Sequence, residues 1–102
     1  MIFRPTEIAD VVAIDVEPRG DERGFLARTY CRSEFADRGM AMPVVQCSTV
    51  FSPRRDTLRG LHYQQSPHWE IKLIRCTRGA AFVVAVDLRD GSRTLHEWGA
   101  SS

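Results

Sequence analysis

The segment that most constrains the fold of this chain is AAFVVAVDL, residues 80–88. It is apolar on both faces and rich in β-branched valine, which is typical of a strand covered on both faces and paired at both edges. The dipeptides Arg78-Gly79 and Asp90-Gly91 flank it as turn signals. We therefore expect residues 80–88 to form a central, fully buried strand.

Shorter segments with β-branched or alternating patterns precede and follow this one, and turn residues separate them. The expected strands cover residues 11–16, 24–30, 44–51, 58–64 and 71–77, and a last strand starts within 94–98. One or two turns of helix are expected over 33–39, with Ser33 as the N-cap and Gly39 as the terminator. Seven short strands with almost no helix predict an all-β sandwich or barrel in one domain, residues 1–102.

Composition excludes several classes of protein. The chain is 43% hydrophobic and 26% charged, as in soluble globular proteins, and no apolar run approaches the roughly 18–20 residues of a membrane span. A net charge of +1 does not fit a dedicated nucleic-acid binder. Residues 1–10 show no secretory signal. We expect a cytoplasmic protein without nucleic-acid or membrane partners, and an apparently truncated barrel or one completed by a partner chain.

The densest group of polar residues is Arg59-Gly60-Leu61-His62-Tyr63-Gln64, followed after a loop by Lys72, the only lysine among fourteen cations. A histidine near a lysine suits abstraction of a proton alpha to a carbonyl. The imidazole takes the proton and the cation stabilises the enolate oxygen. The alternative is a histidine with structural hydrogen bonds in a sheet and a solvated lysine at a sheet edge.

Strict alternation would place His62 and Arg59 on opposite faces of a strand. A bulge at Gly60 would bring them to the same face, because glycine tolerates the backbone angles that a bulge requires. Gln46 and Ser48 share a face in their own predicted strand. They would present an amide and a hydroxyl to a ligand, or make cross-strand hydrogen bonds.

A metal site of the cupin type would need converging histidine and carboxylate ligands. His62, His68 and Glu70 are available, but the chain has no His-x-His pair. We therefore expect no metal.

Six segments occur in an order that resembles the dTDP-4-dehydrorhamnose 3,5-epimerase family, over about the N-terminal half of a member. They are residues 21–25, 45–46, 58–64, 72–75, 84–89 and 92–98. The resemblance implies a nucleotide-sugar epimerase of deoxysugar (rhamnose) biosynthesis. Such an enzyme inverts C3 and/or C5 of a dTDP-4-keto-6-deoxy-hexose without a cofactor or metal. It also implies a jelly-roll of the cupin type and a homodimer with exchanged strands.

The resemblance also assigns roles to single residues. His62 matches the general base, and Lys72 matches the cation beside the 4-keto oxygen. Arg59 and Arg23 match arginines that hold the nucleotide diphosphate, Arg23 from the neighbouring subunit. Gln46 matches a glutamine of the binding site, and Ser48 stands beside it where the family usually has asparagine.

The chain departs from the family pattern at several positions. Leu26 replaces a common aromatic residue, Arg28 replaces a glutamate, and Ile71 replaces a glycine. The family's tyrosine general acid and the aspartate that orients its base lie beyond residue 102. The alternative function is therefore a catalytically impaired homologue that only binds a sugar nucleotide or dimerises.

Overall fold

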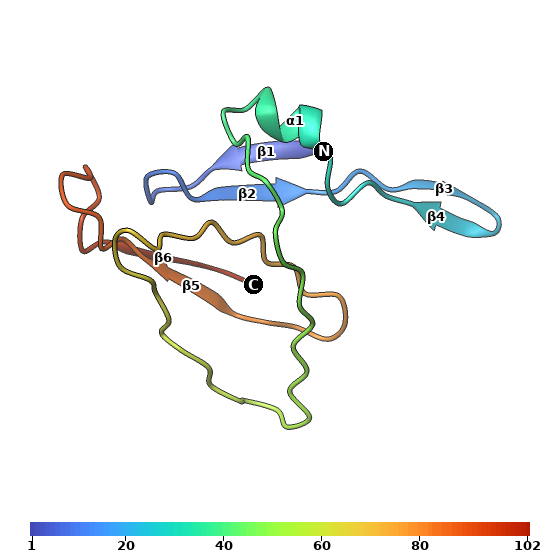
Figure 1. The fold of residues 1–102 in the computed structure, drawn as a ribbon. Helices are drawn as coiled ribbons and strands as arrows, with labels where there is room; N and C mark the ends of the chain where they lie inside the picture. The colour runs from blue at the N-terminus through green and yellow to red at the C-terminus, as the bar shows by residue number, and fades with distance from the viewer.

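The strands pair two by two in a computed structural model that describes residues 1–102 (Figure 1). All three pairs are antiparallel hairpins. They are β1 (Ile2–Pro5) with β2 (Val12–Asp15), β3 (Arg19–Asp21) with β4 (Gly24–Leu26), and β5 (Val83–Val86) with β6 (Trp98–Ser101). With one short helix, α1 (Arg32–Ala36), the chain is all-β, as predicted.

The predicted central strand is shorter and more open than its sequence suggests. Only Val83–Val86 of residues 80–88 pair, and only with β6. Val83 and Val86 are exposed. The prediction of a fully buried central strand is therefore wrong, because no strand of this chain reaches the other edge of β5.

The last strand begins later than predicted. Residues 94–97 form a turn in which the Glu97 amide donates to the Thr94 carbonyl at 2.9 Å. His96 has a φ of 68°, which ends the extended backbone there. The hairpin then continues into Trp98–Ser101.

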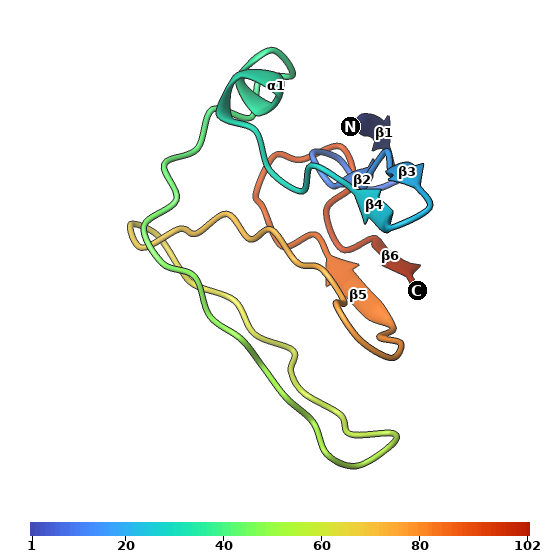
Figure 2. The ribbon, with the colours of Figure 1, turned by 90° about the vertical axis from the view of Figure 1, so that its right-hand side faces the viewer.

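The expected strands at 44–51, 58–64 and 71–77 are not present. Between residues 41 and 82 a single backbone–backbone hydrogen bond occurs, from the His68 amide to the Gln65 carbonyl. This part of the chain runs as long irregular loops away from the hairpins (Figures 1 and 2). A β-branched segment forms a strand only when another backbone supplies its hydrogen bonds, and here none does.

Helix α1 confirms the helix expected over 33–39, although its N-cap is Cys31 and not Ser33. Cys31 has extended backbone angles, and its carbonyl accepts the Phe35 amide at 3.0 Å. Gly39, with a φ of 73°, terminates the turn as predicted. Phe35 is only 2% exposed and packs edge-on against Phe3 at 5.3 Å between ring centroids. This small aromatic contact joins α1 to β1.

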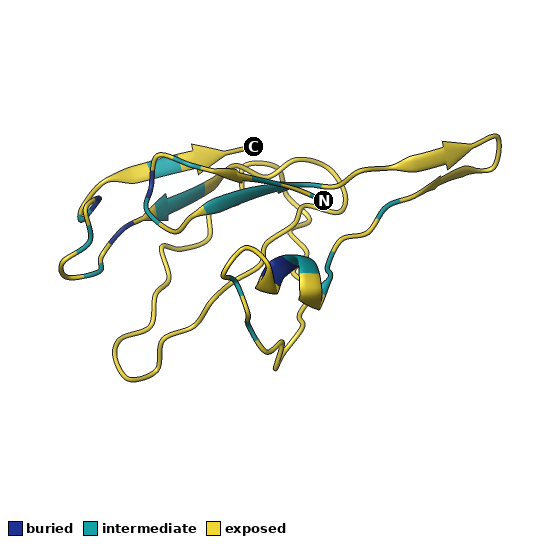
Figure 3. Cartoon of the chain, turned by 90° about the horizontal axis from the view of Figure 1, so that it is seen from above, coloured by how far each residue is buried: buried dark blue, intermediate teal, exposed yellow.

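The molecule as a whole is open. Its accessible surface is 9550 Å², whereas a folded monomer of 11.6 kDa exposes about 5,800 Å². Its radius of gyration is 15.5 Å, against about 13 Å for a compact chain of this length. Buried residues are few and lie near α1 and the turns beside β1 and β5 (Figure 3). No helix is long and apolar enough to cross a membrane.

Candidate functional site

The residues predicted to carry chemistry lie on the most exposed part of the chain. His62, Lys72, Arg59, Gln46 and Ser48 fall within residues 43–82, every one of which is exposed. The His62 ring makes no hydrogen bond, so it is not a histidine with structural partners in a sheet. The structure leaves these side chains open to solvent and joins none of them directly to another.

Arg59 is the most firmly held of the five. Its Nε donates to the Ser52 Oγ at 3.0 Å, and its Nη2 donates to the Phe51 carbonyl at 3.2 Å. No strand ladder forms around Gly60, so the predicted bulge is not present, although Gly60 does have a φ of 109°. Arg59 is therefore oriented by side-chain contacts and not by strand pairing.

Arg23 lies in the turn between β3 and β4 and pairs with Asp21. Its Nε donates to Asp21 Oδ1 at 3.1 Å, and its backbone amide donates to the same oxygen at 2.9 Å. These hydrogen bonds lower the pKa of Asp21 and raise the pKa of Arg23. The guanidinium is thus already matched by one carboxylate.

Lys72 pairs with Glu70, with 2.8 Å between Nζ and Oε1. The two residues lie two positions apart, so an extended backbone places both side chains on one side. Gln46 and Ser48 make no side-chain hydrogen bond, so the cross-strand bonds that were their alternative role are not formed. No group of three or more His, Cys, Asp or Glu side chains is arranged to hold a metal ion.

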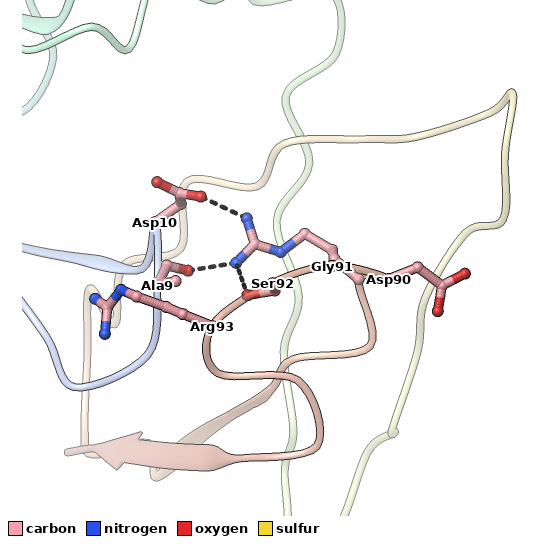
Figure 4. A pocket seen from close by; sticks show the side chains of 7 residues that line it. Ala9, Asp10, Asp90, Gly91, Ser92 and Arg93 are labelled. Carbon is pink, nitrogen blue, oxygen red and sulfur yellow. Dashed lines mark hydrogen bonds and ion pairs between the residues drawn. The ribbon is translucent and has the colours of Figure 1, made fainter.

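Sequence reasoning missed a polar cluster between the β1–β2 turn and the loop after β5, here called the Asp87–Arg89 cluster. It comprises Asp10, Asp87, Arg89, Ser92 and Thr94. Three of these residues, Asp10, Arg89 and Ser92, line a hollow of about 410 Å³ (Figure 4). Arg89 donates to Asp10 at 2.6 Å and to both carboxylate oxygens of Asp87 at 2.9 Å. The Asp87 side chain is 1% exposed.

Hydrogen bonds from Arg89, then Ser92 and Thr94, hold the pKa of Asp87 far below its usual range. Asp87 and Asp10 in turn raise the pKa of Arg89. The cluster holds two carboxylates and one guanidinium, and Arg89 pairs with both carboxylates. The cluster therefore stabilises the fold and leaves no cation of its own free for an anionic ligand. The signal in the sequence was an aspartate followed by an arginine and two hydroxyl residues at a turn.

Comparisons with known proteins point to one family. A family model described as dTDP-4-dehydrorhamnose 3,5-epimerase matches residues 5–102. A dTDP-4-dehydrorhamnose 3,5-epimerase of Sinorhizobium fredii is 40% identical over 96% of the chain and 50% of its own length. One of Escherichia coli is 39% identical over 91% of the chain and 50% of its own length.

A dTDP-4-dehydrorhamnose 3-epimerase of Streptomyces niveus is 37% identical over 96% of the chain and 47% of its own length. The chain thus spans about half the length of the curated relatives it matches. No solved structure matches it.

Proposed function

The chain belongs to the dTDP-4-dehydrorhamnose 3,5-epimerase family, and on that premise we propose that it acts in epimerisation of a dTDP-4-keto-6-deoxy-hexose. The reaction inverts C3, C5 or both, without a cofactor. The observation that carries the proposal is the family match over residues 5–102, which includes Arg59-Gly60-Leu61-His62 and Lys72.

The chemistry follows from the ketone at C4, which acidifies the protons on both neighbouring carbons. His62 removes one of these protons, the C–H electron pair moves into the enolate, and Lys72 stabilises the charge on its oxygen. A water molecule donates a proton to the opposite face of the enolate, which inverts the carbon, and the hydroxide formed takes the proton from His62. A positioned base contributes roughly 10²–10⁴-fold to such a step. The His62 ring is exposed and so accessible to a substrate, which supports this role.

Substrate binding is assigned to Arg59, Arg23, Gln46 and Ser48. Guanidinium groups suit a diphosphate because their planar fork donates two parallel hydrogen bonds. The free amide of Gln46 and hydroxyl of Ser48 are suited to the polar groups of the nucleoside or sugar. Arg28, which stands where the family has a glutamate, is paired with Glu34 at 3.2 Å. This pairing partly offsets the charge that Arg28 inverts.

The proposed architecture is a jelly-roll of the cupin type that functions as a homodimer with exchanged strands. The exposed apolar side chains around the predicted site support it, since Leu58 is 91% and Val45 is 85% exposed. Burying such side chains against a second copy gains roughly 25 cal/mol per Å² of apolar area. The second copy would also supply backbone hydrogen-bond partners to residues 44–51 and 58–64.

A second candidate function is binding without turnover. It is favoured by one observation, that no side chain of this chain hydrogen-bonds the His62 ring and so fixes its tautomer. On this reading the chain holds a sugar nucleotide or dimerises, but does not move protons.

Deuterium wash-in decides between the two. The protein is incubated with dTDP-4-keto-6-deoxyglucose in heavy water, and C3 and C5 are followed by NMR and mass spectrometry. The epimerase proposal predicts label at one or both carbons above the rate without protein. Absence of label, in a folded sample shown to bind dTDP, would leave the binding module as the function.

A further inference from the structure

We propose that Ser52, together with the Phe51 carbonyl, positions Arg59 to present one free edge of its guanidinium to a diphosphate. Ser52 would thereby be a positioning residue for nucleotide binding. The inference rests on the proposed function, because it takes a sugar-nucleotide diphosphate as the anion that Arg59 binds.

Ser52 Oγ and the Phe51 carbonyl accept hydrogen bonds from Nε and Nη2 at 3.0 and 3.2 Å, so both lie along the Nε–Nη2 edge of the guanidinium. Two of the five N–H donors of Arg59 are used in this way. The remaining three include both on Nη1, and these form the end that suits a bidentate phosphate contact.

The structure records guanidinium hydrogen bonds for Arg23, Arg28, Arg59 and Arg89, and all of these except Arg59 bond a carboxylate. Arg59 alone is held by uncharged acceptors only. Its hydrogen bonds fix its orientation and leave its positive charge uncompensated, as an anion-binding group requires.

The contrast with Arg23 sharpens this point. Arg23 uses the same edge of its guanidinium, Nε and Nη2, but its partner is the Asp21 carboxylate. A negative charge in contact with the guanidinium reduces its attraction for a second anion. We therefore infer that Arg59 contributes more to diphosphate affinity than Arg23.

Residues 52–56, Ser-Pro-Arg-Arg-Asp, turn the backbone, and Thr57 Oγ1 closes the turn by donating to the Arg54 carbonyl at 2.7 Å. This turn brings Arg59 back to Ser52, seven residues earlier. His62 follows three residues after Arg59. A fixed Arg59 would thus set where the diphosphate lies relative to the proposed base.

The test compares Ser52→Ala with the conservative Ser52→Thr and with Ser66→Ala, an exposed serine whose side chain makes no hydrogen bond. Binding of dTDP, inorganic pyrophosphate and thymidine is measured for each by calorimetry or NMR titration. The ¹⁵N signal of Arg59 Nε, identified by its loss in Arg59→Lys, reports the hydrogen bond directly.

We expect Ser52→Ala to weaken dTDP and pyrophosphate binding about 3- to 10-fold, as follows from losing one ordinary hydrogen bond. Thymidine binding should not change, Ser52→Thr should restore affinity, and Ser66→Ala should resemble the parent protein. The Arg59 Nε signal should shift and exchange faster with water in Ser52→Ala alone.

Two results would overturn the inference while leaving the proposed function standing. One is a parent protein that binds dTDP with an affinity that Ser52→Ala does not change. The other is an Arg59 Nε signal that Ser52→Ala leaves in place. A parent protein that binds neither dTDP nor pyrophosphate would overturn both the inference and the proposed function.

Discussion

The Asp87–Arg89 cluster and residues 43–82, the segment that carries the predicted site, differ in where their hydrogen bonds go. Asp87 accepts from Arg89, Ser92 and Thr94, all within seven residues, and Arg89 reaches Asp10 on the neighbouring hairpin. Residues 43–82 form one backbone–backbone hydrogen bond among themselves. The polar groups of the Asp87–Arg89 cluster find their hydrogen-bond partners within the chain, whereas most backbone groups of residues 43–82 do not.

The difference teaches that fold and function place different demands on this sequence. A turn with an aspartate and hydroxyl side chains finds its partners locally and needs no other strand. A strand cannot find its partners locally, because its backbone donors and acceptors need the backbone of a neighbouring strand. Here the proposed chemistry lies on the segment that lacks such neighbours, which is why we propose a second copy as the cover.

The largest expected effect is on proton exchange and comes from removing the proposed base, His62, which lies within residues 43–82. His62→Ala should reduce deuterium exchange at C3 and C5 by at least about 10²-fold, because a positioned base contributes about that much or more. Binding of dTDP should remain. His96→Ala is the matched control, since His96 is exposed and lies outside residues 43–82. Undiminished exchange in His62→Ala would mean that another group is the base.

The next effect tests whether packing is confined to one region. Phe35→Ala should destabilise α1 and β1 by about 3 kcal/mol, because Phe35 is buried against Phe3 and Tyr30. Phe82→Ala is the same substitution at a side chain that is 72% exposed, and should cost less than about 0.5 kcal/mol. Thermal unfolding of both variants measures the contrast. Equal costs would show that the region around Phe82 is packed and the comparison is wrong.

A smaller effect concerns the diphosphate. Arg59→Ala should weaken dTDP binding by about 1.5–3 kcal/mol, the usual loss for a hydrogen bond to a charged group. Arg54→Ala serves as the control, because the Arg54 side chain is exposed and makes no ion pair. Calorimetric titration provides the measurement. If Arg54→Ala weakened binding as much as Arg59→Ala, net charge and not the orientation of Arg59 would hold the ligand.

The smallest expected effect is a loss of stability of the Asp87–Arg89 cluster that occurs only at acidic pH. The pKa of Asp87 is lowered in the fold, so its charged form stabilises the cluster at every pH above the ordinary value of 3.8. That stabilisation declines as the pH falls below this value, and it should not vary between pH 5 and 8. Thermal unfolding measured as a function of pH follows the change in stability, and Asp87→Asn should abolish the acid-dependent part. An unchanged acid response in Asp87→Asn would assign it to another carboxylate.

Only part of the local structure could be predicted from sequence, where its causes are local. The strand expected over 24–30 is limited to Gly24–Leu26, and β1 and β3 were not expected. The β-branched run at 11–16 became β2, and the turn that follows α1 ends at Gly39, which adopts a positive φ. The prediction for residues 80–88 was wrong for a non-local reason. A segment that is apolar on both faces is suited to burial, but its pattern does not say whether the chain supplies the strands that would cover it.

The candidate site could be predicted only as a set of residue types. The chemistry of histidine, lysine and arginine points to the residues of the site. It does not point to the hydrogen-bond partners that hold the arginine side chains. The hydrogen bond between Arg59 and Ser52 depends on a turn of the chain. The hydrogen bond from Arg89 to Asp10 joins residues 79 positions apart. Neither spacing follows from strand or helix periodicity.

Residue-resolved amide hydrogen exchange tests the central comparison most directly, in a sample shown by sedimentation velocity to be monomeric. The amides of Asp87 and His96, which donate to the Glu97 and Asp87 carbonyls, should be protected. The amides of residues 44–51 and 58–64 should exchange as fast as those of an unstructured peptide. Protection of residues 58–64 in the monomer, equal to that of Asp87, would contradict the account, because the site segment would then have its partners within its own chain.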